Sequence, residues 1–447
     1  MTETRSDRVE PVSPLLSRLW YRRYVLGLLF MTYILNVVDR SPVLAVSLQF
    51  IKEEFQASDT QLGLLTGIAF ALFYSTMGIP IAAWADRSNR RNVLALAVAL
   101  WSGMTALCGY AVNFTMLFAT RVGTAVGEAG GSPPSHSLIS DYFPKRERGT
   151  AFSIFALGVP FGTMLGSLVA GWGIENYGWR NTFVIVGAPG LLFAVLVRLT
   201  IREPPRGMAD NVGRAAAGAK APGMFEVLRF LWRRVSFRHL CLAAALHSVV
   251  WYASGAFNAS FFIRSHAMTV GQAANWLAVF AGIGAVGTFL GGYAADRMSV
   301  RTNDRRWYMW VPGIATLVMV PFEFPAYLAD NLWIALPTFG INMGLAAVFF
   351  GPSFAMTQAL APLRMRSVAT SLLLFVQTLI GYGLGPLVVG NISDRLNPLL
   401  EMNSLRWGLV IVGMSNIWAA THYFLGARAL REDLAETERL ASAAEKR

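Results

Sequence analysis

The sequence predicts an all-α membrane protein whose twelve transmembrane helices form two pseudo-symmetric six-helix bundles. Three observations support this fold class. The chain has 447 residues, of which 54% are hydrophobic and only 14% are charged, whereas soluble globular proteins contain about 25% charged residues. Many of its apolar stretches are long enough to cross a bilayer. The two halves of the chain also repeat the same charged motif.

Twelve apolar segments have the length that a helix needs to cross the hydrocarbon core, about 20 residues. They run over residues 24–48, 60–85, 91–112, 114–139, 149–173, 180–201, 237–262, 272–295, 307–329, 332–360, 367–391 and 405–428. The longest polar break follows the sixth segment and divides the chain into six spans plus six.

This division gives five expected regions. They are an N-terminal cytoplasmic segment at 1–23, a first bundle at 24–201, a linker at 202–236, a second bundle at 237–428 and a cytoplasmic tail at 429–447. Prolines and glycines mark the first part of the linker as a loop. Residues Met224 to Trp232 have the spacing of a short amphipathic helix on the inner membrane surface.

The basic residues lie mainly on one side of the predicted membrane. With the N-terminus in the cytoplasm, the inside segments hold 30 lysines and arginines and the outside connections hold 5. This bias predicts an integral membrane protein with both termini in the cytoplasm. It also accounts for the net charge of +12, so we expect no nucleic-acid partner. The outer connections lack glycan-rich loops, which favours the bacterial inner membrane.

Two acid–base sets fall inside predicted spans. Asp39 and Arg40 are adjacent in span one, and Arg121 and Glu128 lie in span four. A charge at bilayer depth is costly and usually faces a protein interior or a water-filled path. Because Arg121 and Glu128 are seven residues apart, they share one face of their helix. The structural alternative is a pair of salt bridges that pin the helices together.

The repeated motif ends the second span of each half. Ala82-Ala83-Trp84-Ala85-Asp86-Arg87 is followed by Arg90 and Arg91, and Gly292-Tyr293-Ala294-Ala295-Asp296-Arg297 has the same place in the second half. Parallel halves with such marks indicate two homologous bundles around a central site.

With these motifs the chain resembles the major facilitator superfamily of secondary transporters, from about residue 20 to residue 428. The family's loop motif, glycine-x-x-x-Asp-Arg-x-Gly-Arg-Arg, matches at Asp86, Arg87, Arg90 and Arg91, while Ala82 and Asn89 replace its two glycines. The resemblance implies the major facilitator fold and transport by alternating access. It also implies that the motif residues latch the two halves together on the cytoplasmic side: Asp86, Arg87, Arg90, Asp296 and Arg297. The alternative is a permanent solvated ion pair, which contributes little stability.

Two further sequences resemble the Spinster-like branch of this superfamily. They are Asn36-x-x-Asp39-Arg40 in span one and Gly127-Glu128-Ala129-Gly130-Gly131-Ser132-Pro133-Pro134 in span four. That branch includes transporters of sphingolipids and lysophospholipids, with proton coupling proposed for several members. Organic-anion transporters of the same superfamily also carry a Gly-Glu-Ala sequence in span four. A proton-coupled transporter of a small organic anion is therefore the alternative.

In this architecture spans one and four line the central cavity of the first half. We expect Asp39 and Glu128 to carry protons, because moving a neighbouring arginine changes the cost of their charged forms. Arg40 is the expected charge partner and anion contact, since arginine keeps its charge. Arg121 either shares that role or pins the helix. The implied partners are protons, membrane lipids and an amphipathic small molecule or lysolipid.

The second half contributes the other candidate substrate contacts. We expect no interior charges there comparable with those of the first half. Spans seven and ten offer Trp251, Tyr252, Asn258 and Asn342, an apolar wall with a few polar groups that suits an acyl chain or ring system. Ordinary helix packing is the alternative, and His247 is expected to be structural.

Enzyme and receptor functions are disfavoured by the same sequence. It shows no metal-binding cluster, no convincing nucleophile–base pair and no sizeable domain outside the predicted membrane. A phosphate-cradling loop of the P-loop type is also missing, which disfavours ATP-driven pumping. We therefore expect neither a cofactor nor a metal.

Overall fold

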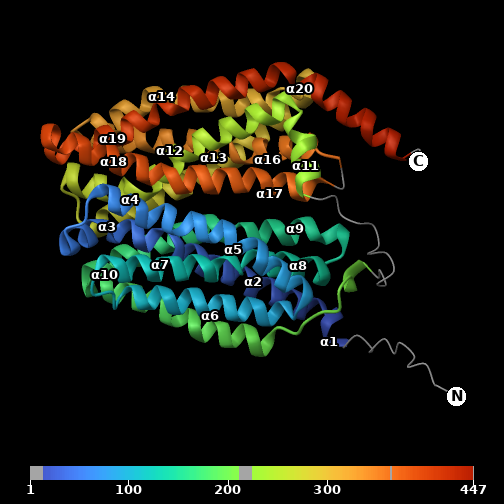
Figure 1. Ribbon diagram of the computed structural model, residues 1–447, viewed down its shortest axis with the longest axis horizontal. Coiled ribbons are helices and arrows are strands. Elements are labelled where there is room, and N and C mark those ends of the chain that lie inside the picture. The colour runs from blue at the N-terminus through green and yellow to red at the C-terminus, as the bar shows by residue number, and fades with distance from the viewer. Residues whose placement is uncertain (1–13, 211–223, 363–364, 446–447) are drawn as a thin grey trace.

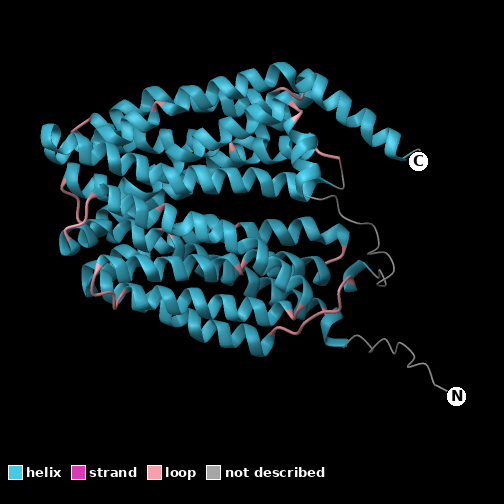
Figure 2. Ribbon diagram, in the orientation of Figure 1, coloured by secondary structure: helices cyan, strands magenta, loops and turns pink. Residues whose placement is uncertain are grey.

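The computed structural model describes residues 14–210, 224–362 and 365–445, and these are predominantly helical (Figures 1 and 2). Parts of four predicted regions therefore lie outside the described residues: 1–13 of the N-terminal segment, 211–223 of the linker, 363–364 of the second bundle and 446–447 of the tail. The described helices form two layers (Figure 1), each built from one half of the chain.

The first half contains ten helices. They are α1 (Pro14–Ser17), α2 (Leu19–Arg40), α3 (Pro42–Phe55), α4 (Asp59–Thr66), α5 (Ile68–Arg87), α6 (Arg90–Cys108), α7 (Phe114–Ala129), α8 (Ser132–Tyr142), α9 (Lys145–Ala156) and α10 (Gly158–Thr200). A short 3-10 turn, η1 (Met208–Asp210), follows them.

The second half begins with α11 (Met224–Trp232), whose Val227 and Leu231 are buried. It continues with α12 (Val235–His266), α13 (Val270–Thr302), α14 (Trp307–Leu328), α15 (Leu332–Ala347), α16 (Phe350–Ala359), α17 (Arg366–Val376), η4 (Gln377–Tyr382), α18 (Gly383–Leu400), η5 (Glu401–Asn403), α19 (Ser404–Gly413) and α20 (Ser415–Glu445).

The chain makes the twelve membrane passes that the sequence predicts. Within the described residues, nine helical segments are long and apolar enough to cross a membrane. Two of them hold two passes each. Arg146–Thr200 reverses at Gly178, whose φ of 77° suits glycine, and Val368–Leu440 reverses around Glu401. The short helices α7 and α8 supply one more pass, interrupted at Gly130.

The first pass is broken in the middle of the membrane. Helix α2 ends at Arg40, Ser41 has the non-helical angles φ −129° and ψ −50°, and α3 starts at Pro42. Proline has no N–H to donate and disfavours helical geometry in the preceding residue. The carbonyl groups in the last turn of α2 therefore need other donors, and irregular backbone at this depth is tolerated only where protein or water supplies them.

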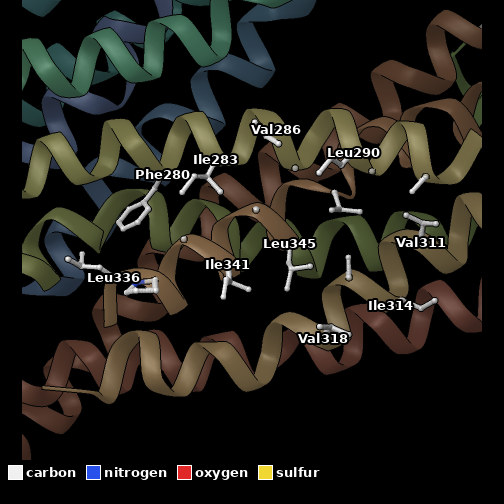
Figure 3. A pocket seen from close by; sticks show the side chains of 18 of the residues that line it. Phe280, Ile283, Val286, Leu290, Val311, Ile314, Val318, Leu336, Ile341 and Leu345 are labelled. Carbon is white, nitrogen blue, oxygen red and sulfur yellow. The ribbon is translucent and has the colours of Figure 1, made fainter. Parts of the chain in front are cut away.

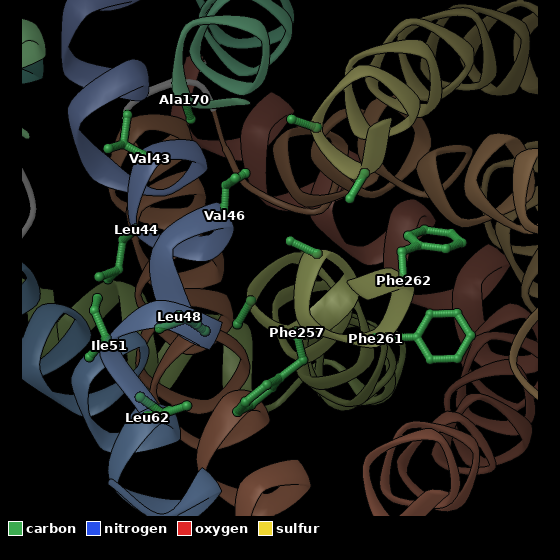
Figure 4. Close-up of a cluster of buried hydrophobic side chains, with 14 of the residues drawn as sticks. Val43, Leu44, Val46, Leu48, Ile51, Leu62, Ala170, Phe257, Phe261 and Phe262 are labelled. Atoms are coloured by element: carbon green, nitrogen blue, oxygen red, sulfur yellow. The ribbon is translucent and has the colours of Figure 1, made fainter. Parts of the chain in front are cut away.

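The two halves touch mainly at one end of the molecule. The first described helix, α1, and the end of the last, α20, lie at the right of Figure 1, which we call the termini end, and the opposite end is the far end. Contacts between the halves pair α4 with α18, α10 with α13 and α3 with α12. A hydrophobic core spans this junction (Figure 4), where Leu48 of α3 and Phe257 of α12 are fully buried. The far end is therefore closed by apolar packing.

Candidate functional site

Arg40 and Glu128 form the centre of the candidate site. Arg40 Nε donates a 2.7 Å hydrogen bond to Glu128 Oε2, and Arg40 Nη2 donates a 2.8 Å bond to Asn36 Oδ1. The Glu128 side chain is completely buried, whereas the Arg40 side chain is 22% exposed. Within the described chain, Glu128 Oε1 makes no hydrogen bond. Arg40 is therefore the member of the pair that a solute can reach.

Asp39 points away from its chain neighbour. Its carboxyl group is 1% exposed and lies beside Trp101 and Ser102 of α6. Arg40 turns instead toward α7, because adjacent residues on a helix project about 100° apart. The predicted acid–base cluster thus consists of an Arg40–Glu128 ion pair and a buried Asp39 carboxyl, which lies beside α6 and still interacts electrostatically with Glu128 and Arg121.

Arg121 completes the broken end of α2. Its Nη1 donates to the Asp39 carbonyl oxygen at 3.1 Å, and its Nη2 donates to the Arg40 carbonyl oxygen at 2.6 Å. These are carbonyls that the break before Pro42 leaves without helical partners. A cation is also favoured at the negative end of the helix dipole. Arg121 is fully buried, and its guanidinium group binds the backbone of Asp39 and Arg40.

Aromatic rings from both halves surround the Arg40 guanidinium. Its Cζ lies 5.0 Å from the ring centre of Phe70 and 4.8 Å from that of Tyr74, both on α5. At such distances ring faces attract a cation. The ring of Tyr382 of η4 packs against that of Phe70 at an interplanar angle of 57°, with ring centres 5.2 Å apart, and its hydroxyl lies 3.2 Å from Ser41 Oγ. The site therefore joins a fixed positive charge to an aromatic surface that crosses from one half to the other.

The four candidates from the second half occupy different environments. Tyr252 packs edge-on against Tyr382 with ring centres 4.6 Å apart, so it belongs to the aromatic surface around Arg40. Trp251 packs against Phe350. Asn258 accepts a 3.1 Å hydrogen bond from the Tyr327 hydroxyl, and Asn342 donates to the Met319 carbonyl oxygen at 3.4 Å. Both amides are buried in contacts with α14, within their own half.

The expectation that the second half has no comparable interior charge is wrong. Glu323 of α14 is 1% exposed, and its Oε1 accepts a 2.8 Å hydrogen bond from Asn416 Nδ2. Its sequence context, Pro321-Phe322-Glu323-Phe324-Pro325, is as apolar as that around Glu128, so the signal was present. His247 is structural, as expected: one ring nitrogen lies 2.8 Å from the Ala346 carbonyl oxygen.

The predicted latch residues make their contacts within their own halves. Arg90 forms ion pairs with Asp141 and Glu203, tying the start of α6 to α8 and to the segment after α10. Asp86 lies 4.0 Å from Arg206, and Asp296 accepts a 2.5 Å hydrogen bond from the Tyr308 hydroxyl. Arg87 and Arg297 are exposed at the ends of α5 and α13. Among the described residues, Asp86 and Arg90 contact the first half and the segment that follows α10, and Asp296 contacts a residue of the second half.

A second charged network, which the sequence did not reveal, joins the halves at the far end. The Asp59 carboxylate accepts hydrogen bonds from Lys52 at 2.7 Å and from Arg264 at 2.9 and 3.0 Å. Ser393 of α18 donates to the same carboxylate at 2.7 Å.

The reciprocal contact comes from Asp394. Its carboxylate accepts the backbone N–H groups of Asp59 and Thr60 at 2.9 and 2.8 Å, and so caps the start of α4 from the other half. The capping box of Ser58 and Gln61 marks that helix start in the sequence. The partner, more than 300 residues away, could not be read from it.

No metal site emerges from the described residues, because nowhere do three or more His, Cys, Asp or Glu side chains gather closely enough to hold an ion.

The chemistry that the Arg40 cluster can perform is recognition of an anion and exchange of a proton.

Known proteins resemble this chain over most of its length. The family model described as Major Facilitator Superfamily matches residues 29–386. A Mycolicibacterium smegmatis protein named as an MFS-type efflux pump is 30% identical over 417 residues, covering 92% of this chain and 94% of that protein. A probable galactarate/D-glucarate transporter of Bacillus subtilis is 23% identical over 371 residues, covering 77% and 78%.

A solved structure gives a closer likeness. A bacterial homologue of the human lysosomal transporter Spinster, in an inward-facing and unoccupied conformation, superimposes with a TM-score of 0.85 at 35% identity. The alignment covers 93% of this chain and 99% of that one.

Proposed function

We propose that this chain, which belongs to the Major Facilitator Superfamily, couples protons to the movement of an amphipathic, lipid-like solute by alternating access. It is a Spinster-like secondary transporter and not an enzyme. The proposed cargo is of the lysophospholipid or sphingolipid type, with an anionic head and an apolar chain.

The observation that carries this proposal is the unequal exposure of the Arg40–Glu128 pair. Arg40 is reachable, and Glu128 is completely buried behind it. An anionic head group that binds Arg40 competes with Glu128 for the same guanidinium. A buried carboxylate that loses its partner is very costly, so Glu128 takes up a proton as the solute binds. Solute binding and proton uptake are thereby linked on one side chain.

Asp39 is the second proposed proton carrier. It is buried next to the Arg121 side chain that holds its own backbone carbonyl. A shift of Arg40 during the rocking of the bundles moves the last turn of α2, to which Asp39 and Arg121 are both tied. Breaking the Arg40–Glu128 ion pair therefore changes the environment of the Asp39 carboxyl group through a movement of the backbone.

The amphipathic character of the cargo is inferred from what surrounds Arg40. Phe70 and Tyr74 present ring faces beside the charge, and Tyr382 and Tyr252 extend this aromatic surface into the second half. A site with one fixed cation and a mainly aromatic lining suits a ligand with a single anionic group and an apolar remainder. The structural likeness of this chain to a bacterial Spinster homologue supports the same class of solute.

The proposal also assigns an orientation. The termini end is placed in the cytoplasm because basic residues concentrate there, and the protein is placed in a bacterial inner membrane. The far-end closure through Asp59 then corresponds to an inward-facing state. In the opposite state we expect Asp86, Arg87, Arg90, Asp296 and Arg297 to hold the cytoplasmic ends of the halves together.

The experiment that tests the cargo class is a binding screen on the purified protein. Lysophosphatidylglycerol, lysophosphatidylethanolamine and sphingosine 1-phosphate are compared with galactarate and D-glucarate by thermal shift and by titration. We expect saturable binding of an anionic lysolipid, lost in Arg40→Ala and retained in the exposed control Arg146→Ala. Binding that is independent of Arg40 contradicts the proposal.

The second candidate function is proton-coupled transport of a small organic anion. The Bacillus subtilis relative, a probable sugar-acid transporter, favours it. The same screen separates the two, because a dicarboxylate needs polar contacts around its hydroxyl groups. Saturable binding of galactarate without binding of any lysolipid would support this alternative.

A further inference from the structure

A large apolar cavity lies on the outer wall of the second half, away from Arg40. It has a volume of about 1160 Å³ and runs between α13 and α14 over a floor formed by α15 (Figure 3). Val286 and Leu290 of α13 face Ile314 and Val318 of α14 across it, and Ile341 rises from the floor. We call this feature the α13–α15 groove. It is larger than the pockets that hold most drug-sized ligands.

The groove follows the membrane normal for most of the hydrocarbon core. Its lining on α13 extends from Trp276 to Ala294, about 27 Å at 1.5 Å per residue, against a hydrocarbon thickness of about 30 Å. Glycines of α13 and α15 bring those two helices together at the floor: a Cβ at Gly287 would overlap the Gly344 carbonyl. The recess above this contact belongs to the protein surface that faces lipid.

Arginines continue the groove-lining face of α13 at its termini end. Leu290 and Ala294 line the groove, and steps of seven residues along the same row of the helix reach Arg297 and Arg301. Both arginines are exposed. On α14 a step of four residues, about one helical turn, leads from Val311 to Trp307, an amphipathic side chain of the type found at membrane interfaces. One face therefore changes from wholly apolar to cationic at the depth where lipid head groups lie.

We propose that the α13–α15 groove binds an anionic phospholipid of the surrounding bilayer, with one acyl chain in the groove and the head group against Arg301 and Arg297. The acyl chain occupies the termini-end part, beside Leu290, Ile314 and Val318. This site is separate from the transport site and does not depend on the proposed cargo.

Charge complementarity selects this occupant over others. A zwitterionic lipid fills the same apolar surface but gains less from two arginines, because basic residues at the membrane surface attract anionic lipids. A second protein chain would have to insert side chains along a recess that runs almost the full hydrocarbon thickness. An acyl chain matches that shape without ordering any further backbone.

The test uses purified wild-type protein, titrated with phosphatidylglycerol or phosphatidylcholine of identical acyl chains and read by native mass spectrometry. We expect phosphatidylglycerol to bind at least fivefold more tightly, which corresponds to about 1 kcal/mol. Replacing both Arg297 and Arg301 by Gln should reduce its affinity to the phosphatidylcholine level, whereas Arg146→Gln in the first half should leave it unchanged. Equal binding of the two lipids to the wild type overturns the proposal.

A matched pair of substitutions tests the groove itself. Ile314 lines it and is 44% exposed, whereas Leu317 lies one turn away, does not line it and is 46% exposed. Ile314→Trp should fill the recess and weaken binding of both lipids, and Leu317→Trp should not. Equal lipid affinities in these two variants contradict the assignment.

A measurement on the unchanged protein covers the case in which a variant fails to fold. Phosphatidylglycerol with a photoactivatable diazirine in its acyl chain is cross-linked to the wild type, and labelled peptides are mapped. Labels concentrated on α13, α14 and α15 support the proposal. An even distribution over the lipid-facing helices of both halves, such as α10, refutes it.

Discussion

Arg40 donates its 2.7 Å hydrogen bond to Glu128, 88 residues away, and not to Asp39, its neighbour in the chain. The side chain that carries the exposed charge is thus paired with a fully buried carboxylate across two helices. The two neighbours project about 100° apart on α2, and Arg121 holds the backbone of both beside the break at Ser41. A local backbone feature therefore decides which acid responds to a ligand at Arg40.

Arg121 is predicted to act mainly as a backbone brace. Arg121→Lys keeps the positive charge, but an ammonium group cannot reproduce the planar fork that reaches both carbonyl oxygens. We expect its free energy of unfolding to fall by about 2 kcal/mol, the usual scale for hydrogen bonds that involve a charged group. Chemical denaturation of Arg121→Lys and of Arg121→Gln measures this. Full stability in the lysine variant would show that charge alone is needed.

Asp59 is predicted to hold the far end closed. Asp59→Asn leaves Lys52 and Arg264 without the carboxylate that neutralises both. We expect the population open at the far end to rise about tenfold, since losing charge-assisted hydrogen bonds costs on the order of 1.4 kcal/mol. Spin labels at Glu53 and Met402, which are exposed at that end, report the distance.

The matched control is Asp330→Asn. Asp330 also pairs with an arginine, Arg406, but both residues belong to the second half. Its substitution should leave the distance distribution as in the wild type. A distribution for Asp59→Asn that matches this control would remove the assignment of Asp59 as a gate.

Glu323 is predicted to be a structural acid packed against a glycine. A Cβ at Gly413 would overlap the Glu323 carboxyl group, so Gly413→Ala should lower the free energy of unfolding by about 1–3 kcal/mol through overpacking. Glu323→Gln keeps an acceptor for Asn416 and should stay within about 1 kcal/mol of the wild type. The control is Gly292→Ala, where an added Cβ meets no atom within 4 Å. Equal stability of the two alanine variants would contradict this packing.

Asp304, in the loop between α13 and α14, is predicted to give the second half a pH-dependent stability. Hydrogen bonds from Arg306, joined by Arg431 of α20, hold the pKa of this carboxyl group below its ordinary value. Because the pKa of Asp304 is lower in the folded than in the unfolded state, its carboxylate stabilises the fold at pH values above the unfolded-state pKa. This stabilisation disappears as the pH falls through the folded-state pKa.

The variant Asp304→Asn removes that contribution. At neutral pH we expect it to be about 1 kcal/mol less stable than the wild type, the upper range for partly exposed ion pairs. The difference should shrink as the pH is lowered through the acidic range. Thermal unfolding measured in detergent from pH 7 downward gives both curves. A difference that stays constant with pH would rule out titration of Asp304.

Much of the fold was predictable, because length and apolarity decide which segments cross a membrane. The twelve passes and the repeated halves follow from that constraint. The helix break at Ser41 was signalled by Pro42, yet the use of Arg121 as its donor depends on how α7 packs against α2. Sequence spacing predicted that Arg121 and Glu128 share one face of their helix. It did not predict that Arg121 binds backbone carbonyls while Glu128 pairs with Arg40.

The contacts between the halves were the least predictable part. Asp59 and Asp394 each look like ordinary residues near helix ends, and only the packing of α4 on α18 brings them together. Glu323 was missed for another reason. It lies in an apolar context like that of Glu128, but no family motif surrounds it, so no motif marks it as a candidate site residue.

The central claim is that Glu128 takes up a proton when a solute binds Arg40. The most direct measurement is proton movement into proteoliposomes that contain a trapped pH-sensitive dye, after addition of the lysolipid that binds best in the screen. Wild type and the exposed-acid control Glu53→Gln should both show solute-dependent proton flux. We predict that Glu128→Gln binds the solute but shows a much smaller solute-dependent proton flux, because only Asp39 remains to carry protons. Solute-dependent proton flux of wild-type size in Glu128→Gln would contradict the account.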